Sequence, residues 1–330
     1  MSAPSVPSKP ATSTDVARLA GVSRATVSRI LNGDDGRFPE ATRARVRDAA
    51  RRLRYRPSAA GRSLVSGRSD TIVVLLPNTT FGSNLQDAVD EVAKRTGPLG
   101  GNVVVRFASP STAATMEALE SLRPLAVVNF GVLASEDAAR LQEHGVIVVP
   151  DRPRPGRLSI DGGMAVMQAE HLVERGVSDL WYGALRDARP DPYGAARFRA
   201  LRAYCQGEGL PEPQLLEIPL TLEGARTPLE RLLRVRGRAG VVCYNDDVAM
   251  ALLAAARDLD VAVPEDLSLV GVDHTAVGQL WSPRLTTIHV DFHGLVESLG
   301  QALEHQVTGT PVEAEVPVRE FFSLVPGETA

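Results

Sequence analysis

The chain has 330 residues, of which 44% are hydrophobic and 23% charged, and its formal net charge is −4. This length exceeds what one hydrophobic core usually supports, so we expect two or three domains of an ordinary globular protein. Two cysteines, Cys205 and Cys243, are too few for a disulfide framework, and no apolar run approaches the roughly 18 residues that span a bilayer. We therefore expect a cytoplasmic protein without a membrane partner.

The charge is divided unevenly along the chain. Residues 1–11 are rich in Ser and Pro and predict a disordered arm. From Lys9 to Arg68 there are fourteen Lys and Arg against five Asp and Glu, a net charge of +9 that leaves −13 for the remainder. A basic N-terminal part on an acidic body is typical of a DNA-binding domain attached to a core that avoids DNA.

The segment from Thr12 to Asn32, TSTDVARLAGVSRATVSRILN, predicts two short helices joined by a tight turn. Thr12 and Asp15 have the spacing of a capping box, which satisfies free N–H groups where a helix begins. We expect the apolar face of this first helix to comprise Val16, Ala17, Leu19 and Ala20.

The second helix follows a turn that Gly21 permits, and Ser23 is a good N-cap for a helix from Arg24 to about Leu31. The residues expected to pack inward are Val27, Ile30 and Leu31. The residues expected to face outward are Arg24, Ala25, Ser28 and Arg29. A helix-turn-helix inserts such a basic, polar face into the major groove of DNA.

Residues Glu40 to Leu53 predict a third helix, because apolar residues recur at helical spacing and Pro39 stands just before its start. The segment Tyr55 to Leu64, YRPSAAGRSL, then precedes a short polar linker. Together these segments resemble the LacI/GalR family of transcriptional regulators, in which three helices are followed by a hinge helix and a periplasmic-binding-protein-like core.

The resemblance implies a set of DNA contacts in the second helix and in the hinge segment Tyr55 to Leu64. Leu64 falls where the family places a leucine that wedges into the minor groove, and an apolar wedge of this kind kinks the duplex. Gly61 replaces the usual alanine and costs about 1 kcal/mol of helix stability, so we expect a hinge that is disordered without DNA. The expected DNA-binding residues are Ser23, Arg24, Ala25, Thr26, Ser28, Arg29, Asn32, Tyr55, Ser58, Arg62 and Leu64.

From Thr71 onward, apolar runs of strand length alternate with amphipathic stretches of helix length, which implies parallel sheets covered on both faces. The resemblance implies an α/β core of two Rossmann-like subdomains, periplasmic-binding-protein-like, with a small all-α helix-turn-helix domain before it. The expected divisions are an arm 1–11, a DNA-binding domain 12–57, a hinge helix and linker 58–70, a first subdomain 71–160 plus 290–320, and a second subdomain 161–289 plus 321–330.

Three core segments match the family closely: residues 196–201, 241–250 and 269–273. The resemblance implies that Arg197, Asn245 and Asp273 hydrogen-bond the hydroxyls or carboxylate of a small effector. Asn245 could instead be a helix N-cap, and Asp273 a turn residue. Phe81, in a first loop that looks shorter than in relatives, could line the cleft or be a plain core or loop aromatic. A cleft with few aromatics disfavours an ordinary hexose as effector.

Met250 and Trp281 match family positions that face a partner subunit, and both residue types are enriched at interface cores. Trp281 could alternatively be a core aromatic. His289 and His293 are four residues apart, but we expect them at the end of a strand and the start of a helix, and we predict no metal site.

No nucleotide-binding or metalloprotease motif supports catalysis, so we expect no enzyme activity and no cofactor. The sequence predicts a cytoplasmic bacterial regulator: a homodimeric repressor of double-stranded DNA that binds a near-palindromic operator under the control of a small polar effector. The alternative is the same regulator controlled by a protein partner, or constitutive, without an effector.

Overall fold

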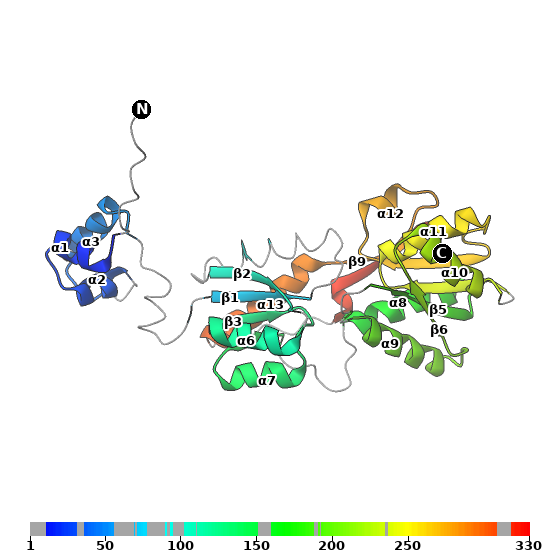
Figure 1. The fold of residues 1–330 in the computed structure, drawn as a ribbon, viewed down its shortest axis with the longest axis horizontal. Helices are drawn as coiled ribbons and strands as arrows, with labels where there is room; N and C mark the ends of the chain where they lie inside the picture. Colours follow the sequence, from blue (N-terminus) through cyan, green and yellow to red (C-terminus); the bar gives the residue numbers. More distant parts are fainter. Residues whose placement is uncertain are drawn as a thin grey trace, which may run out of the picture. The chain divides into compact units, whose positions relative to one another are not determined.

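The computed structural model (Figure 1) describes residues 11–31, 36–55, 69, 71–77, 90, 93–94, 102–109, 111–150, 160–187, 191, 193–234, 237–308 and 318–330. The chain divides into two compact units, residues 1–70 with 122–125, and residues 71–121 with 126–330. None of the helices within these described ranges is long and apolar enough to cross a membrane.

The described residues of the first unit form three helices, as the sequence predicts: α1 (Ser13–Ala20), α2 (Arg24–Leu31) and α3 (Glu40–Arg52). Small and β-branched side chains from all three form one apolar cluster: Val16, Ala17, Ala20, Val27, Ile30, Val46, Ala49 and Ala50. The expectation that Leu19 belongs to the apolar face is wrong, because its side chain is 51% exposed. The exposed positions on α1 also include its neighbour Arg18, so the other two helices leave this side of α1 uncovered.

The second unit begins with a four-stranded parallel sheet of order β2-β1-β3-β4. Its strands are β1 (Thr71–Leu76), β2 (Asn102–Phe107), β3 (Ala126–Asn129) and β4 (Ile147–Val149). Among the described residues, the main helices of this subdomain are α6 (Thr112–Leu122), α7 (Ser135–Glu143) and α13 (Phe292–Thr308). Alternate residues of β1 pack in opposite directions: Val73 and Leu75 meet α6 and α7, whereas Ile72 clusters with Leu303 of α13.

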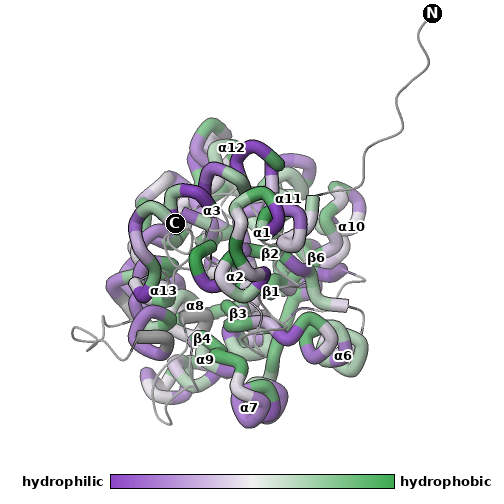
Figure 2. Tube along the Cα trace, turned by 90° about the vertical axis from the view of Figure 1, so that its left-hand side faces the viewer, coloured by the Kyte–Doolittle hydropathy of each residue, from purple (hydrophilic) through white to green (hydrophobic). Residues whose placement is uncertain are grey.

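The amphipathic pattern of α7 explains its place. Its trace alternates between purple and green in Figure 2, and Leu141 is its buried residue. The polar residues of this helix therefore remain on the surface while one apolar side chain joins the core.

A second, six-stranded sheet has the order β10-β9-β8-β7-β5-β6. Its strands are β5 (Asp179–Leu185), β6 (Gln214–Ile218), β7 (Ala239–Cys243), β8 (Leu267–Val272), β9 (Thr286–Val290) and β10 (Phe322–Val325). Only β10 is antiparallel to its neighbour. The remaining elements are α8 (Ile160–Glu174), α9 (Gly194–Gly207), α10 (Leu222–Leu232), α11 (Asp246–Asp258), α12 (Ala276–Leu280) and the 3₁₀ helix η2 (Val318–Phe321).

Helices α8 and α9 pack together, as do α10 and α11, and Figure 1 shows the two pairs on opposite faces of this sheet. This arrangement confirms the predicted fold class of two Rossmann-like α/β subdomains preceded by a helical domain. The exact divisions between subdomains stay predictions.

The last residues are inserted into the second sheet. Thr329 is fully buried, and its backbone carbonyl accepts from the Leu269 N–H while its hydroxyl donates to the Leu269 carbonyl, both at 2.8 Å. The same hydroxyl accepts from the Thr286 N–H at 2.9 Å. Thr329 thus connects β8 and β9 next to the first residue pair of their own register, Val270 and Thr286.

Candidate nucleic-acid interface and effector site

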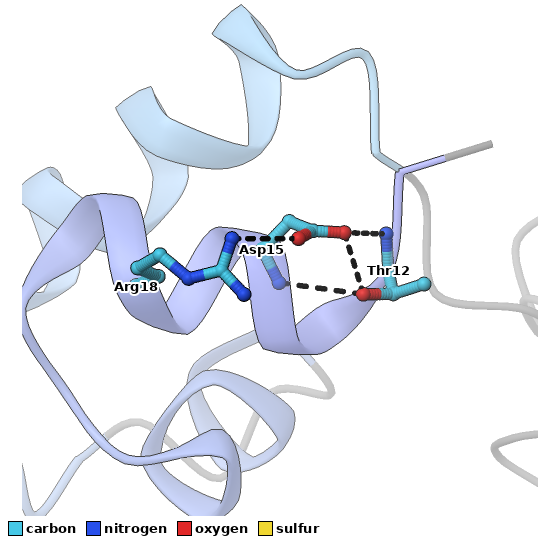
Figure 3. A network of polar contacts seen from close by, with 3 residues as sticks. All are labelled: Thr12, Asp15 and Arg18. Atoms are coloured by element: carbon cyan, nitrogen blue, oxygen red, sulfur yellow. Dashed lines mark hydrogen bonds and ion pairs between the residues drawn. The ribbon is translucent and has the colours of Figure 1, made fainter. Parts of the chain in front are cut away.

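The helix-turn-helix is fixed at its start by the predicted capping box (Figure 3). The Thr12 hydroxyl accepts from the Asp15 N–H at 3.3 Å, and one Asp15 carboxylate oxygen accepts from the Thr12 N–H at 3.0 Å. The other carboxylate oxygen pairs with Arg18 at 3.3 Å. At the far end of α1, Gly21 adopts the left-handed conformation, with φ of 65°, that the turn requires.

The exposed face of α2 carries the side chains expected to read DNA. Arg24, Ala25 and Arg29 are exposed, whereas Val27 and Ile30 are buried. Ser23 caps the helix, because its hydroxyl accepts from the Thr26 N–H at 3.1 Å and lies 2.9 Å from the Thr26 hydroxyl. This geometry presents the first turn of α2 to solvent, as a recognition helix requires.

Of the remaining residues expected to contact DNA, one packs against the helical cluster and four lie outside the described residues. Tyr55 packs partly buried against the three-helix cluster, and its N–H donates to the Ala50 carbonyl at 2.9 Å. Four other expected DNA-binding residues lie outside the described residues: Asn32, Ser58, Arg62 and Leu64. Phe81, expected at the effector cleft, lies outside them too.

The carboxyl ends of β7 and β8, neighbours in the second sheet, bring the expected effector residues together. Ligands of open α/β sheets bind beyond these ends. Asn245 follows β7, Asp273 follows β8, and Arg197 reaches the same place from α9. All three therefore belong to one cluster, as the sequence predicts.

Arg197 is only 7% exposed. Its Nη1 donates to the backbone carbonyl of Tyr244 at 2.5 Å. The guanidinium carbon lies 5.0 Å from the centroid of the Tyr244 ring and 5.7 Å from that of Tyr193, so two aromatic faces flank the cation. These two tyrosines were not singled out from the sequence; the first loop, on which the expectation of few aromatics rested, lies outside the described residues.

Asp273 has an unusual backbone and an unusual carboxyl group. Its φ of 106° is rare for a residue with a side chain, and its N–H donates to the Ile288 carbonyl at 2.9 Å. Burial raises the pKa of this carboxyl to about 7, although the positive charge of Arg197 acts in the opposite direction. Asp273 can therefore accept or donate a hydrogen bond near neutral pH.

Asn245 acts as the N-cap of α11, because its side-chain oxygen accepts from the Val248 N–H at 3.0 Å. The helix-cap interpretation is thus confirmed, and contact with a ligand stays a prediction.

Asp246, which was not predicted from the sequence as a site residue, supports the site through hydrogen bonds of its carboxylate. It is fully buried, and its carboxylate accepts from the Thr275 N–H at 2.7 Å, the Thr275 hydroxyl at 3.0 Å and the Thr287 hydroxyl at 2.5 Å. Burial raises its pKa to about 6 despite these hydrogen bonds. Gly271 is required beside it, since a Cβ there would collide with the carboxylate. Asp246 therefore holds the turn that carries Asp273.

A groove of about 660 Å³ lies between α10, α11 and the segment around α12. Its lining includes Met250, which is half-buried on α11, and Trp281, which is 36% exposed and lies under the Arg257 guanidinium at 5.5 Å. Nearby Val277 is 61% exposed and Leu280 is 87% exposed. The expectation of Trp281 as a buried core aromatic is therefore disfavoured, and this surface exposes several large apolar side chains close together.

His289 lies near the end of β9 and His293 near the start of α13, as expected. The His289 ring packs edge-on against the His274 ring, with 5.5 Å between the ring centroids. Within the part of the chain that the structure describes, no group of three His, Cys, Asp or Glu side chains is arranged to hold a metal ion.

Comparison with known proteins agrees with this architecture. Residues 12–58 match "Bacterial regulatory proteins, lacI family", and residues 169–330 match "Periplasmic binding protein-like domain". The "HTH-type transcriptional regulator GalR" of Salmonella typhimurium is 30% identical over 295 residues, which cover 84% of each chain. The chain belongs to the LacI family.

Other LacI-family proteins extend the likeness. The "HTH-type transcriptional regulator RegA" of Clostridium saccharobutylicum is 27% identical over 83% of this chain and 86% of its own. The lac repressor dimer bound to operator and the anti-inducer ONPF superimposes with a TM-score of 0.73, at 23% identity, over 97% of this chain and 99% of the repressor. This LacI-family chain is a DNA-binding transcriptional regulator, and its named relatives are regulators rather than enzymes.

Proposed function

We propose that this protein is a cytoplasmic, homodimeric repressor that binds a near-palindromic operator, and that a small polar effector held by Arg197 and Asp273 sets its affinity for DNA. The observation that carries the effector proposal is the cluster at the ends of β7 and β8. A buried cation, a carboxyl group with a pKa of about 7 and two tyrosine rings meet there. Such a set recognises hydroxyl or carboxylate oxygens on a compact ligand.

The DNA-binding proposal rests on α2 and the basic first unit. Arg24, Ala25 and Arg29 read base edges in the major groove, while Ser23, Thr26 and Ser28 position the helix on phosphates. Loss of one arginine paired with guanine costs about 1–3 kcal/mol and relaxes specificity at one base pair. Leu64 enters the minor groove at the operator centre.

The dimer proposal rests on the groove beside Met250 and Trp281. Aromatic and Met side chains are enriched at interface cores, and a two-fold axis through this surface pairs two helix-turn-helix units for a near-palindromic site. Control by the effector follows as population shift, because a ligand that binds one closure state better shifts the core toward that state.

The test begins with selection of operator sequences from a random DNA library by the full-length protein. Release of the selected operator is then measured against a metabolite panel that includes cellobiose, found in a solved complex of the transcriptional regulator CelR, and ribose, bound in a solved LacI-family regulator of Enterococcus faecium. We expect at least one compound to release wild-type protein and to fail with Asp273→Ala, whose operator affinity without ligand stays normal. Release of Asp273→Ala at the wild-type concentration would refute the assigned site. Failure of every metabolite with wild-type protein would favour control by a protein partner or constitutive binding.

A further inference from the structure

Tyr193 connects the effector cluster to the other subdomain. Its backbone N–H and that of Gly194 both donate to one carboxylate oxygen of Asp191 at 2.9 Å, so the residue is fixed where α9 begins. The Arg197 N–H donates to the Tyr193 carbonyl at 3.1 Å. One turn of helix therefore sets the tyrosine ring beside the Arg197 guanidinium, 5.7 Å from the ring centroid.

The other end of the same side chain reaches the first subdomain. The Tyr193 hydroxyl donates to the backbone carbonyl of Phe130, just past β3, at 3.0 Å. The ring also lies against Gly131, whose φ is 77° and where a Cβ would stand only 3.0 Å from the ring atom Cε1. Both contacts join residues more than 60 positions apart in the sequence.

The acceptor of this hydrogen bond is rigid. The Phe130 N–H donates to the Leu75 carbonyl of β1 at 3.0 Å. The Asn129 side chain ties down the turn that follows, because its oxygen accepts from the Val132 and Leu133 N–H groups at 2.9 Å each. Since donor and acceptor are both anchored within their own subdomains, the bond between them reports on the distance between the subdomains.

We propose that Tyr193 is a positioning residue that couples the state of Arg197 to the closure of the two core subdomains; this inference rests on the proposed function. The hydroxyl stabilises the closed arrangement through Phe130, while the ring contacts the guanidinium that the effector engages. A ligand that moves Arg197 displaces the ring, and displacement of the ring breaks or forms the bond to Phe130. Tyr193 thereby transmits occupancy of the site into a change of closure.

Closure is measurable without any effector. Glu136 on α7 and Gln206 on α9 are exposed, one in each subdomain, and are replaced by cysteines that carry nitroxide labels. The native Cys205 and Cys243 are buried and leave the labelling selective. Pulsed electron paramagnetic resonance then gives the distance distribution of the full-length protein with and without Tyr193→Phe, which removes only the hydroxyl.

We expect Tyr193→Phe to shift the ratio of short to long distances toward long ones by about 2- to 10-fold, the range that one net hydrogen bond between uncharged groups supplies. Gly131→Ala, whose Cβ would stand 3.0 Å from the Cε1 atom of the Tyr193 ring and displace it, shifts the ratio in the same direction. The matched control is Tyr204→Phe on the same helix, whose hydroxyl makes no hydrogen bond within the described part of the chain, and it leaves the distribution unchanged.

A Tyr193→Phe distribution identical to those of wild type and Tyr204→Phe overturns the inference, provided that circular dichroism shows an intact fold. If Tyr193→Phe does not fold, Gly131→Ala decides by the same criterion. The operator-release panel judges the effector proposal separately. A shifted distribution in a protein that no metabolite releases would uphold the coupling residue and refute the effector.

Discussion

The raised pKa of Asp273 predicts a pH-dependent stability that Asp273→Asn removes. The carboxyl group titrates near pH 7 in the folded protein and near 3.8 when unperturbed. The folded state therefore prefers the protonated form. The stability contributed by this group is fully present below about pH 4 and is lost as the pH rises through 7.

The size of the effect follows from the same values. A rise from 3.8 to about 7 corresponds to about 4 kcal/mol at 1.36 kcal/mol per pH unit. Because the Asp273 side chain is partly exposed, solvent screening reduces this figure to about 1–2 kcal/mol. Asparagine mimics the neutral acid, so Asp273→Asn matches wild type below about pH 4 and exceeds its stability by about 1–2 kcal/mol at pH 8.

Urea denaturation at five pH values checks this prediction. The chain has two tryptophans, Trp181 and Trp281, and both lie in the second subdomain, so their fluorescence follows the unfolding of the part that contains Asp273. Asp246 titrates in the same range, and for that reason the difference between variant and wild type is the quantity to compare. The control is Asp260→Asn, an exposed aspartate that also has positive φ. A difference between Asp273→Asn and wild type that does not change from about pH 3.5 to 8 refutes the reasoning.

Three further predictions concern single side chains. Thr12→Ala removes the capping box of α1 and destabilises the DNA-binding unit by about 1 kcal/mol in thermal unfolding, while Thr14→Ala at an exposed position of the same helix does not; equal effects would contradict the role of the cap. Asp246→Ala leaves the Thr275 N–H and the Thr287 hydroxyl without their shared acceptor, so it lowers the free energy of unfolding by about 2–4 kcal/mol. The control is Asp247→Ala, which changes an exposed neighbouring residue and leaves the free energy of unfolding nearly unchanged. Trp281→Asp sediments as a monomer at micromolar concentration while Leu215→Asp, an exposed apolar residue outside the groove, remains dimeric; a dimeric Trp281→Asp protein would show that the interface lies elsewhere.

Local signals made the helix-turn-helix predictable. The capping box, the turn glycine and the spacing of Val27 and Ile30 all act within one or two helical turns, and the structure has the helices where these signals put them. The prediction that Leu19 lies on the apolar face was wrong because periodicity identifies such a face but not its width. The width of the buried face depends on how far the neighbouring helices extend over it.

The effector cluster was predictable only in part. Arg197, Asn245 and Asp273 were expected because residues 196–201, 241–250 and 269–273 resemble the LacI/GalR family, and the last two of these side chains also follow strands β7 and β8. Tyr193 was missed because its importance arises from a contact with Phe130, and Asp246 because its threonine partners are 29 and 41 residues away. The one available signal was an acid three residues after the apolar run that forms β7, since a carboxylate that becomes buried at such a place is costly unless donors lie nearby.

The burial of Thr329 has a consequence for the order of events on the ribosome. The second sheet lacks the hydrogen bonds by which Thr329 connects β8 and β9 until that residue has emerged. The three helices of the helix-turn-helix domain are complete by Tyr55. At about 5–20 residues per second, translation separates these two moments by roughly 15–55 s. During that interval the nascent chain carries a complete helix-turn-helix on an unfinished core. Any partner that recognises the helix-turn-helix therefore meets it first as part of a single, still growing chain.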